Sequence, residues 1–161
     1  MKTVASKVWS FIKLLFNYLI GKRPSAPVEP ELPEKYYPSF PPTEFELQLV
    51  IEINKYRVAN GVKELKYHQR LSDVCRSHSE YLCSINDGNH DNFKERAANF
   101  PKNSIKENVA VGFSTPSSTV NAWSRSEGHR LAMVNQFMVN LGVSMVENAN
   151  GKKFVTSLLM N

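Results

Sequence analysis

The side chains of this chain that most readily bind metals or transfer protons near neutral pH are those of its four histidines. They are His68, His78, His90 and His129. His68 falls in a polar connector and is expected at the surface. His78 falls on the apolar side of a predicted helix, where a histidine is more often a core residue than a ligand. His90 and His129 each lie beside a glycine-bearing turn and are the candidates for chemistry.

Two short motifs contain these candidates, and a third motif lies between them in the sequence. Residues 90–96 read HDNFKER, residues 106–112 read KENVAVG, and residues 123–129 read WSRSEGH, followed by Arg130. In this order and spacing they resemble the signature of bacterial members of the CAP family, also called the SCP or cysteine-rich secretory protein superfamily. The resemblance covers about Glu44 to Asn161. It implies an α+β fold, an α–β–α sandwich around a small antiparallel sheet.

The resemblance also implies a shared cleft in which His90, Glu107 and His129 face one another. Many animal members of the family add a second carboxylate three residues after the tryptophan, where this chain has Ser126. The neighbouring Glu127 would point about 100° away on a helix. The expected set is therefore a His–Glu–His triad. The residues expected to support the cleft are Arg96 and Asn108, which lie in the same motifs, and Ser126, whose hydroxyl can hydrogen-bond within it.

Two imidazoles and one carboxylate form a donor set that suits zinc or another divalent cation. Three protein ligands leave one position for water, and zinc lowers the pKa of bound water toward ~7. The alternative is a hydrogen-bonded polar cluster in which the carboxylate of Glu107 orients both rings. The sequence leaves both interpretations open, because a fold does not by itself define a site.

Two function classes follow for this cleft. The favoured one is an extracytoplasmic, non-enzymatic binding module with a lipid, glycan or protein ligand. The alternative is a metal-dependent or serine-type hydrolase that uses the same cleft. Ser126 and His129 are three residues apart, but the chain has no nucleophile-elbow sequence of the form G-x-S-x-G. No catalytic nucleophile is therefore assigned.

Helix and strand signals predict the framework around the motifs. The sequence TEFE, Thr43 to Glu46, has the capping-box pattern of a helix start, and Asn60-Gly61 is a helix stop. Alternating apolar residues at 141, 143 and 145, the turn sequence NANG and a second apolar run predict a C-terminal hairpin. The remaining expected elements are helices at about 71–85, 117–126 and 130–134, and strands at 109–113 and 154–159.

Cys75 and Cys83 are the two cysteines of the chain. Both fall in the predicted second helix, eight residues apart, so their Cα atoms should lie about 12 Å from each other. A disulfide requires less than about 7 Å. We expect both thiols to be reduced and at least partly buried.

Positive charge is concentrated at the start of the chain. Residues 1–23 hold five of the 20 basic residues and no acid, so the other 15 basic residues balance all 15 acidic ones. A nucleic-acid-binding domain would carry the excess on its own surface, so nucleic acid is not an expected partner. The apolar run from Val8 to Ile20 has 13 residues, fewer than the ~20 that span a bilayer.

The leader, residues 1–23, is best interpreted as a basic amphipathic helix that binds a membrane surface. A cleaved signal peptide and a helix that docks on a protein are the alternatives. Residues 24–42 hold seven of the nine prolines and form a predicted semi-rigid linker. Residues 43–161 form the predicted CAP-like domain. The expected location is extracytoplasmic, either secreted or anchored to a membrane.

Overall fold

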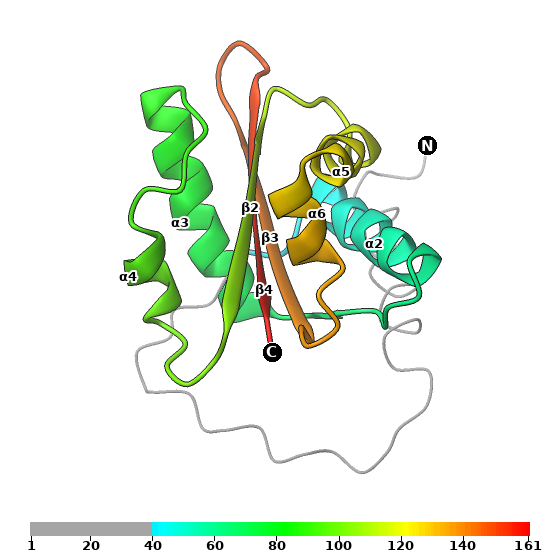
Figure 1. Ribbon diagram of the computed structural model, residues 1–161. Coiled ribbons are helices and arrows are strands. Elements are labelled where there is room, and N and C mark those ends of the chain that lie inside the picture. Colours follow the sequence, from blue (N-terminus) through cyan, green and yellow to red (C-terminus); the bar gives the residue numbers. More distant parts are fainter. Residues whose placement is uncertain (1–39) are drawn as a thin grey trace. The chain divides into compact units, whose positions relative to one another are not determined.

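A four-stranded sheet lies between two layers of helices in the computed structural model, which describes residues 40–161 (Figure 1). The predicted leader and nearly all of the predicted linker lie outside the described residues. In chain order the elements are α2 (Glu44–Ala59), β1 (Lys66–Tyr67), α3 (Gln69–Ile85), α4 (Phe93–Ala97), β2 (Ile105–Val111), α5 (Pro116–Arg125), α6 (Glu127–Met133), β3 (Asn140–Glu147) and β4 (Lys153–Met160). Helices α3 and α4 cover one face of the sheet, and α2, α5 and α6 cover the other. The predicted α–β–α sandwich is confirmed.

Helix α2 begins and ends where its sequence signals predict. The Thr43 hydroxyl accepts from the Glu46 amide, and the Glu46 carboxylate accepts from the Thr43 amide at 2.7 Å. This reciprocal cap satisfies two amides that a helix start would otherwise leave without partners. Asn60 caps the other end, and Gly61 follows with φ of +74°, a conformation that favours glycine.

Helix α3 begins at Gln69, two residues before the predicted start. The cause is His68, whose ring nitrogen Nδ1 accepts from the backbone amide of Leu71 and so caps the helix. His68 is therefore a structural capping residue, half-buried against the ring of Phe100. The helix ends at Asn86, which adopts a left-handed conformation with φ of +54°.

The sheet has the strand order β1-β3-β4-β2. The β3–β4 hairpin confirms the predicted C-terminal strands, with Val143 opposite Ser157 and Glu147 opposite Lys153. The expectation of an antiparallel sheet needs one correction. Strand β1 pairs in parallel with the start of β3. It has only two residues, so an alternating pattern could not be recognised in the sequence.

Strand β2 is longer at its start than predicted, and helix α4 was not predicted at all. Helix α6 begins at Glu127 rather than Arg130, so His129 is a helical residue. Trp123 of α5 is buried, and its Nε1 donates to the carbonyl of Val109 at 2.9 Å. That bond covers a backbone acceptor on β2, which is an edge strand.

Cys75 and Cys83 are free thiols, as the spacing predicted, with Cys75 buried and Cys83 half-buried. Burial raises the pKa of the Cys75 thiol well above its ordinary value, so this thiol is inert packing rather than a nucleophile. None of the helices within residues 40–161 has the length and apolar character needed to cross a membrane.

Candidate functional site

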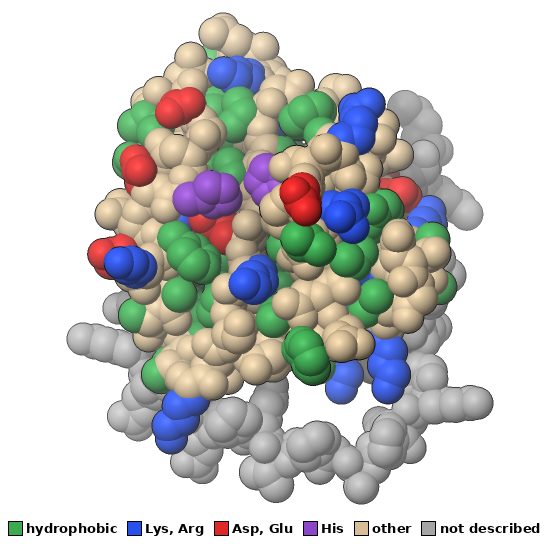
Figure 2. Space-filling model, viewed as in Figure 1, with side chains coloured by type: hydrophobic (Ala, Val, Ile, Leu, Met, Phe, Trp, Pro, Cys, Tyr) green, Lys and Arg blue, Asp and Glu red, His purple; other side chains and the backbone are tan. Residues whose placement is uncertain are grey.

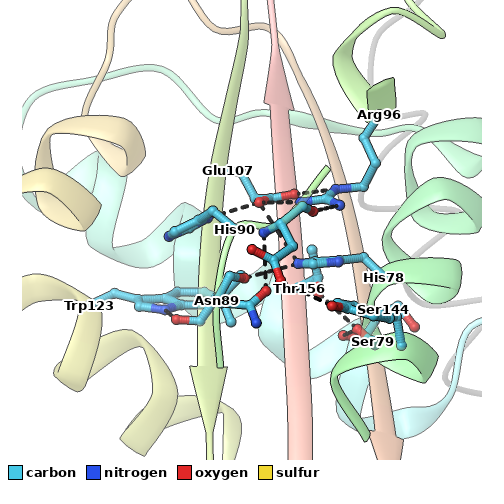
Figure 3. A network of polar contacts seen from close by, with 12 residues as sticks. His78, Ser79, Asn89, His90, Arg96, Glu107, Trp123, Ser144 and Thr156 are labelled. Atoms are coloured by element: carbon cyan, nitrogen blue, oxygen red, sulfur yellow. Dashed lines mark hydrogen bonds and ion pairs between the residues drawn. The ribbon is translucent and has the colours of Figure 1, made fainter. Parts of the chain in front are cut away.

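Glu107 lies at the centre of a polar network on the α3 face of the sheet (Figure 3). Its side chain is only 2% exposed, yet it points from strand β2 toward charged and polar groups of α3, α4 and the loop before α4. A buried carboxylate of this kind is retained in a fold only when it is paired and hydrogen-bonded.

Both oxygens of Glu107 have partners. Arg96 of α4 binds the carboxylate with two bonds, from Nε to Oε2 at 2.7 Å and from Nη2 to Oε1 at 2.8 Å. His90 Nδ1 lies 2.8 Å from Oε1. The prediction that Arg96 is a basic partner in this cleft agrees with these contacts. Because the carboxylate accepts at Nδ1, the neutral His90 ring carries its proton there and presents a lone pair at Nε2.

His129 of α6 lies beside His90. The two ring centroids are 6.2 Å apart, with the planes inclined by 41°. Asn108 donates from Nδ2 to the backbone carbonyl of His129 at 3.2 Å and so fixes the start of α6 against β2. Burial lowers the pKa of His129, and the nearby His90 lowers it further. Both effects favour a neutral imidazole, which is the form that binds metals.

The two histidines border a surface groove of about 360 Å³. Residues Val109, Ala110 and Val111 of β2 also line it, together with Phe113 and Lys152. The side chain of His90 is 51% exposed. Figure 2 shows histidine side chains, in purple, beside each other on this face of the molecule.

The structure therefore brings His90, Glu107, His129, Arg96 and Asn108 to one region. Ser126 lies at the junction of α5 and α6, and its side chain makes no capping hydrogen bond to α6.

His78 is a member of the network that the sequence did not identify. The expectation of a buried position is correct, because its side chain is 1% exposed, but its Nε2 lies 3.1 Å from the carbonyl of Asn89 and 4.0 Å from Glu107 Oε1. Burial lowers the pKa of His78, and the charge of Arg96 lowers it further.

Two neighbouring imidazoles are a donor set that suits a divalent cation such as zinc. Within residues 40–161, no three His, Cys, Asp or Glu side chains are grouped so as to hold a metal ion. Glu107 is bonded to both Arg96 and His90, so its carboxylate orients the His90 ring. The three-ligand set stays a prediction.

Comparison with known proteins identifies the fold family. The profile of the cysteine-rich secretory protein family, CAP, matches residues 50–159, more than half of the chain. The chain belongs to the CAP family. This CAP domain is 29% identical over 116 residues to YkwD, an uncharacterised protein of Bacillus subtilis (strain 168). The match covers 66% of this chain and 44% of YkwD, so the chain spans less than half the length of that relative.

Solved structures have the same fold as this CAP domain. An extracellular protein containing an SCP domain, from Bacillus anthracis str. Ames, superposes with a TM-score of 0.65 and 24% identity, over 76% of this chain and 45% of that one. NaASP2 with Zn²⁺ superposes with a TM-score of 0.58 and 14% identity, over 72% of this chain and 78% of that one. At these identities the likeness establishes the fold.

Proposed function

We propose that this CAP domain is an extracytoplasmic binding module whose groove binds a divalent cation, zinc in the first instance, through His90 and His129. The observation that carries the proposal is the pair of neighbouring imidazoles, with Glu107 bonded to Nδ1 of one of them. A carboxylate in that position fixes the ring tautomer and makes the other ring nitrogen a better ligand.

A bound cation would supply a Lewis-acidic centre that polarises an oxygen or nitrogen of a ligand in the groove. The chain's own residues hold the rings. Arg96 neutralises Glu107, Glu107 orients His90, and Asn108 anchors the backbone of His129. Zinc accompanies NaASP2, another protein of this fold, which supports zinc as the first cation to test.

A binding role is favoured over hydrolysis in the same groove by the state of Glu107. Both carboxylate oxygens accept hydrogen bonds from Arg96, so the group is a poor general base. The extracytoplasmic setting is supported by the basic, apolar leader of this chain. It is also supported by the extracellular SCP-domain protein of Bacillus anthracis, which has the same fold.

The test is a zinc titration of the full chain under reducing conditions. Calorimetry measures the affinity, and thermal unfolding measures the stabilisation. Zinc at about 100 times its Kd should stabilise the wild-type protein by about 2.7 kcal/mol. His90→Ala and His129→Ala should each abolish this stabilisation. His68→Asn is the matched control, since it removes an imidazole from the helix α3 cap but keeps a side chain that caps well. Equal zinc stabilisation in wild type and His129→Ala would refute the site.

A further inference from the structure

The loop that carries His90 is held by contacts from the helices on either side. His78, on α3, reaches the carbonyl of Asn89 with its Nε2 at 3.1 Å. The Asn89 side chain in turn accepts from the backbone amide of Asp91 at 3.0 Å. The residue immediately before His90 is thus bonded through its main chain and through its side chain.

The residue after His90 is bonded as firmly. The Tyr81 hydroxyl, also from α3, donates to Asp91 Oδ2 at 3.0 Å. Arg96 Nη1 donates to the Asp91 carbonyl while the same guanidinium binds Glu107. His90 therefore lies between two residues that are each tied to α3 or α4. A ligand side chain on a loop needs this kind of support to keep its ring in place.

Packing alone does not explain a histidine at position 78. Its side chain is 1% exposed and its ring stacks on Tyr81 with centroids 6.0 Å apart. An apolar residue would fill the same space without a polar atom to satisfy. The 4.0 Å separation from Glu107 Oε1 is too long for a hydrogen bond, so the short contact of His78 is the one to the Asn89 carbonyl. The imidazole therefore acts on the loop and not directly on the carboxylate.

From these contacts we infer that His78 is a positioning residue for the groove: by donating from Nε2 to the Asn89 carbonyl it holds the His90 ring where Glu107 and a cation can both bind it. The inference rests on the proposed metal site for its functional consequence. Its structural consequence, an ordered loop at residues 89–91, does not require a metal.

Two substitutions in the full chain separate the hydrogen bond from the packing. His78→Leu fills the space but removes the donor, whereas His78→Gln keeps an amide donor near the position of Nε2. Zinc binding measured by calorimetry should weaken about 10-fold or more in His78→Leu, as is typical when a residue that orients a metal ligand is lost. His78→Gln should bind within about threefold of wild type, on the same scale.

Cys75→Ala is the control for a general loss of stability. Cys75 is buried on the same helix, one turn before His78, and packs in an apolar cluster with Leu71 and Leu158. This variant should lose packing and keep the zinc affinity of the wild type. Equal weakening in Cys75→Ala and His78→Leu, or failure of His78→Gln to restore binding, would overturn the inference.

Amide hydrogen exchange without metal distinguishes this inference from the proposed function. The amides of Asp91 and Phe93 donate within the loop, to Asn89 Oδ1 and to the His90 carbonyl. Their exchange should speed up in His78→Leu and return to the wild-type rate in His78→Gln. If wild type binds no zinc, the proposed cation site fails while the exchange result still decides the positioning role. Unchanged exchange in His78→Leu would overturn that role.

Discussion

Arg96 and Glu107 form the pair on which the polar network depends. Two parallel bonds join them, and the carboxylate is almost fully buried. A buried pair of this kind contributes little net free energy when intact, but removing one partner leaves an uncompensated charge. The network is therefore sensitive to single changes.

Replacement of Arg96 by Met should lower the free energy of unfolding by about 3 kcal/mol, because Glu107 would stay buried without its counter-ion. The unfolding free energy of Arg96→Lys should lie between those of the wild type and Arg96→Met, since one ammonium cannot reproduce the two parallel bonds. Urea unfolding followed by fluorescence measures both. The double variant Arg96→Met, Glu107→Gln should recover part of the loss, and absence of any recovery would contradict the assignment.

The protonation of His78 should make stability depend on pH. Burial and Arg96 lower its pKa in the folded protein, while Glu107 opposes the shift. The unfolded chain, with an ordinary histidine pKa of ~6.5, therefore binds more protons just below that pH. This contribution is complete above ~6.5 and is lost as the pH falls from there toward the lower folded pKa. Unfolding free energies measured from pH 7 to 5 should drop less steeply in His78→Gln than in wild type. Identical slopes would exclude this role for His78.

Helix α3 and strand β3 come into close contact at Gly142, an element-scale constraint. A Cβ atom there would lie 2.3 Å from the Leu71 Cβ and 2.4 Å from backbone atoms of α3. Backbone cannot move aside as the end of a flexible side chain can, so the helix would have to shift from the sheet. Gly142 therefore allows α3 to pack closely against β3.

Gly142→Ala should therefore destabilise the domain by about 3 kcal/mol, because the added methyl group forces the helix away from the sheet. Gly128→Ala is the matched change, because Gly128 lies in α6 with open space where a Cβ atom would be added. It should stabilise the domain by about 0.5–1 kcal/mol through the lower entropy of the unfolded chain. Thermal unfolding of both variants gives the comparison, and a stable Gly142→Ala protein would argue against the close packing.

Local signals predicted the elements that carry their own boundaries. Helix α2 has a complete capping box, and the β3–β4 hairpin has alternating residues around NANG, so both were found from sequence. Helix α4 has five residues and β1 has two, too few to show a period. Helix α6 begins at Glu127, earlier than predicted, and Asn108 binds the His129 carbonyl through a contact 21 residues apart that local patterns cannot contain.

The candidate site divides in the same way. His90, Glu107 and His129 were identified through motif resemblance, and the motifs also pointed to Arg96 and Asn108. His78 was missed because its importance comes from a contact with the loop eleven residues later, while its own helical position looks like ordinary core. A histidine on an apolar helix face, followed by a polar loop that bears a second histidine, is the signal that could have indicated it.

The net positive charge of the whole chain belongs to the leader. Residues 1–23 hold five basic residues and no acid, whereas the remaining 15 basic and 15 acidic residues balance each other. A cation near an anionic membrane contributes about 1 kcal/mol, and this attraction is screened by salt. We therefore expect the leader to bring the binding groove close to a membrane surface.

The full chain should bind vesicles of phosphatidylserine and phosphatidylcholine at low salt and should release them as salt rises. A full-length variant with Gln at Lys2, Lys7, Lys13, Lys22 and Arg23 keeps the apolar residues and removes the charge, so it should bind much more weakly. Co-sedimentation across a salt series measures both proteins. If the mature protein isolated from its source begins near Ala26 or Pro27, the leader is a cleaved signal, and anchoring fails while secretion stands. If the intact chain does not bind anionic vesicles at low salt, both membrane interpretations fail, and docking of the leader on a protein becomes the explanation that its apolar run from Val8 to Ile20 supports.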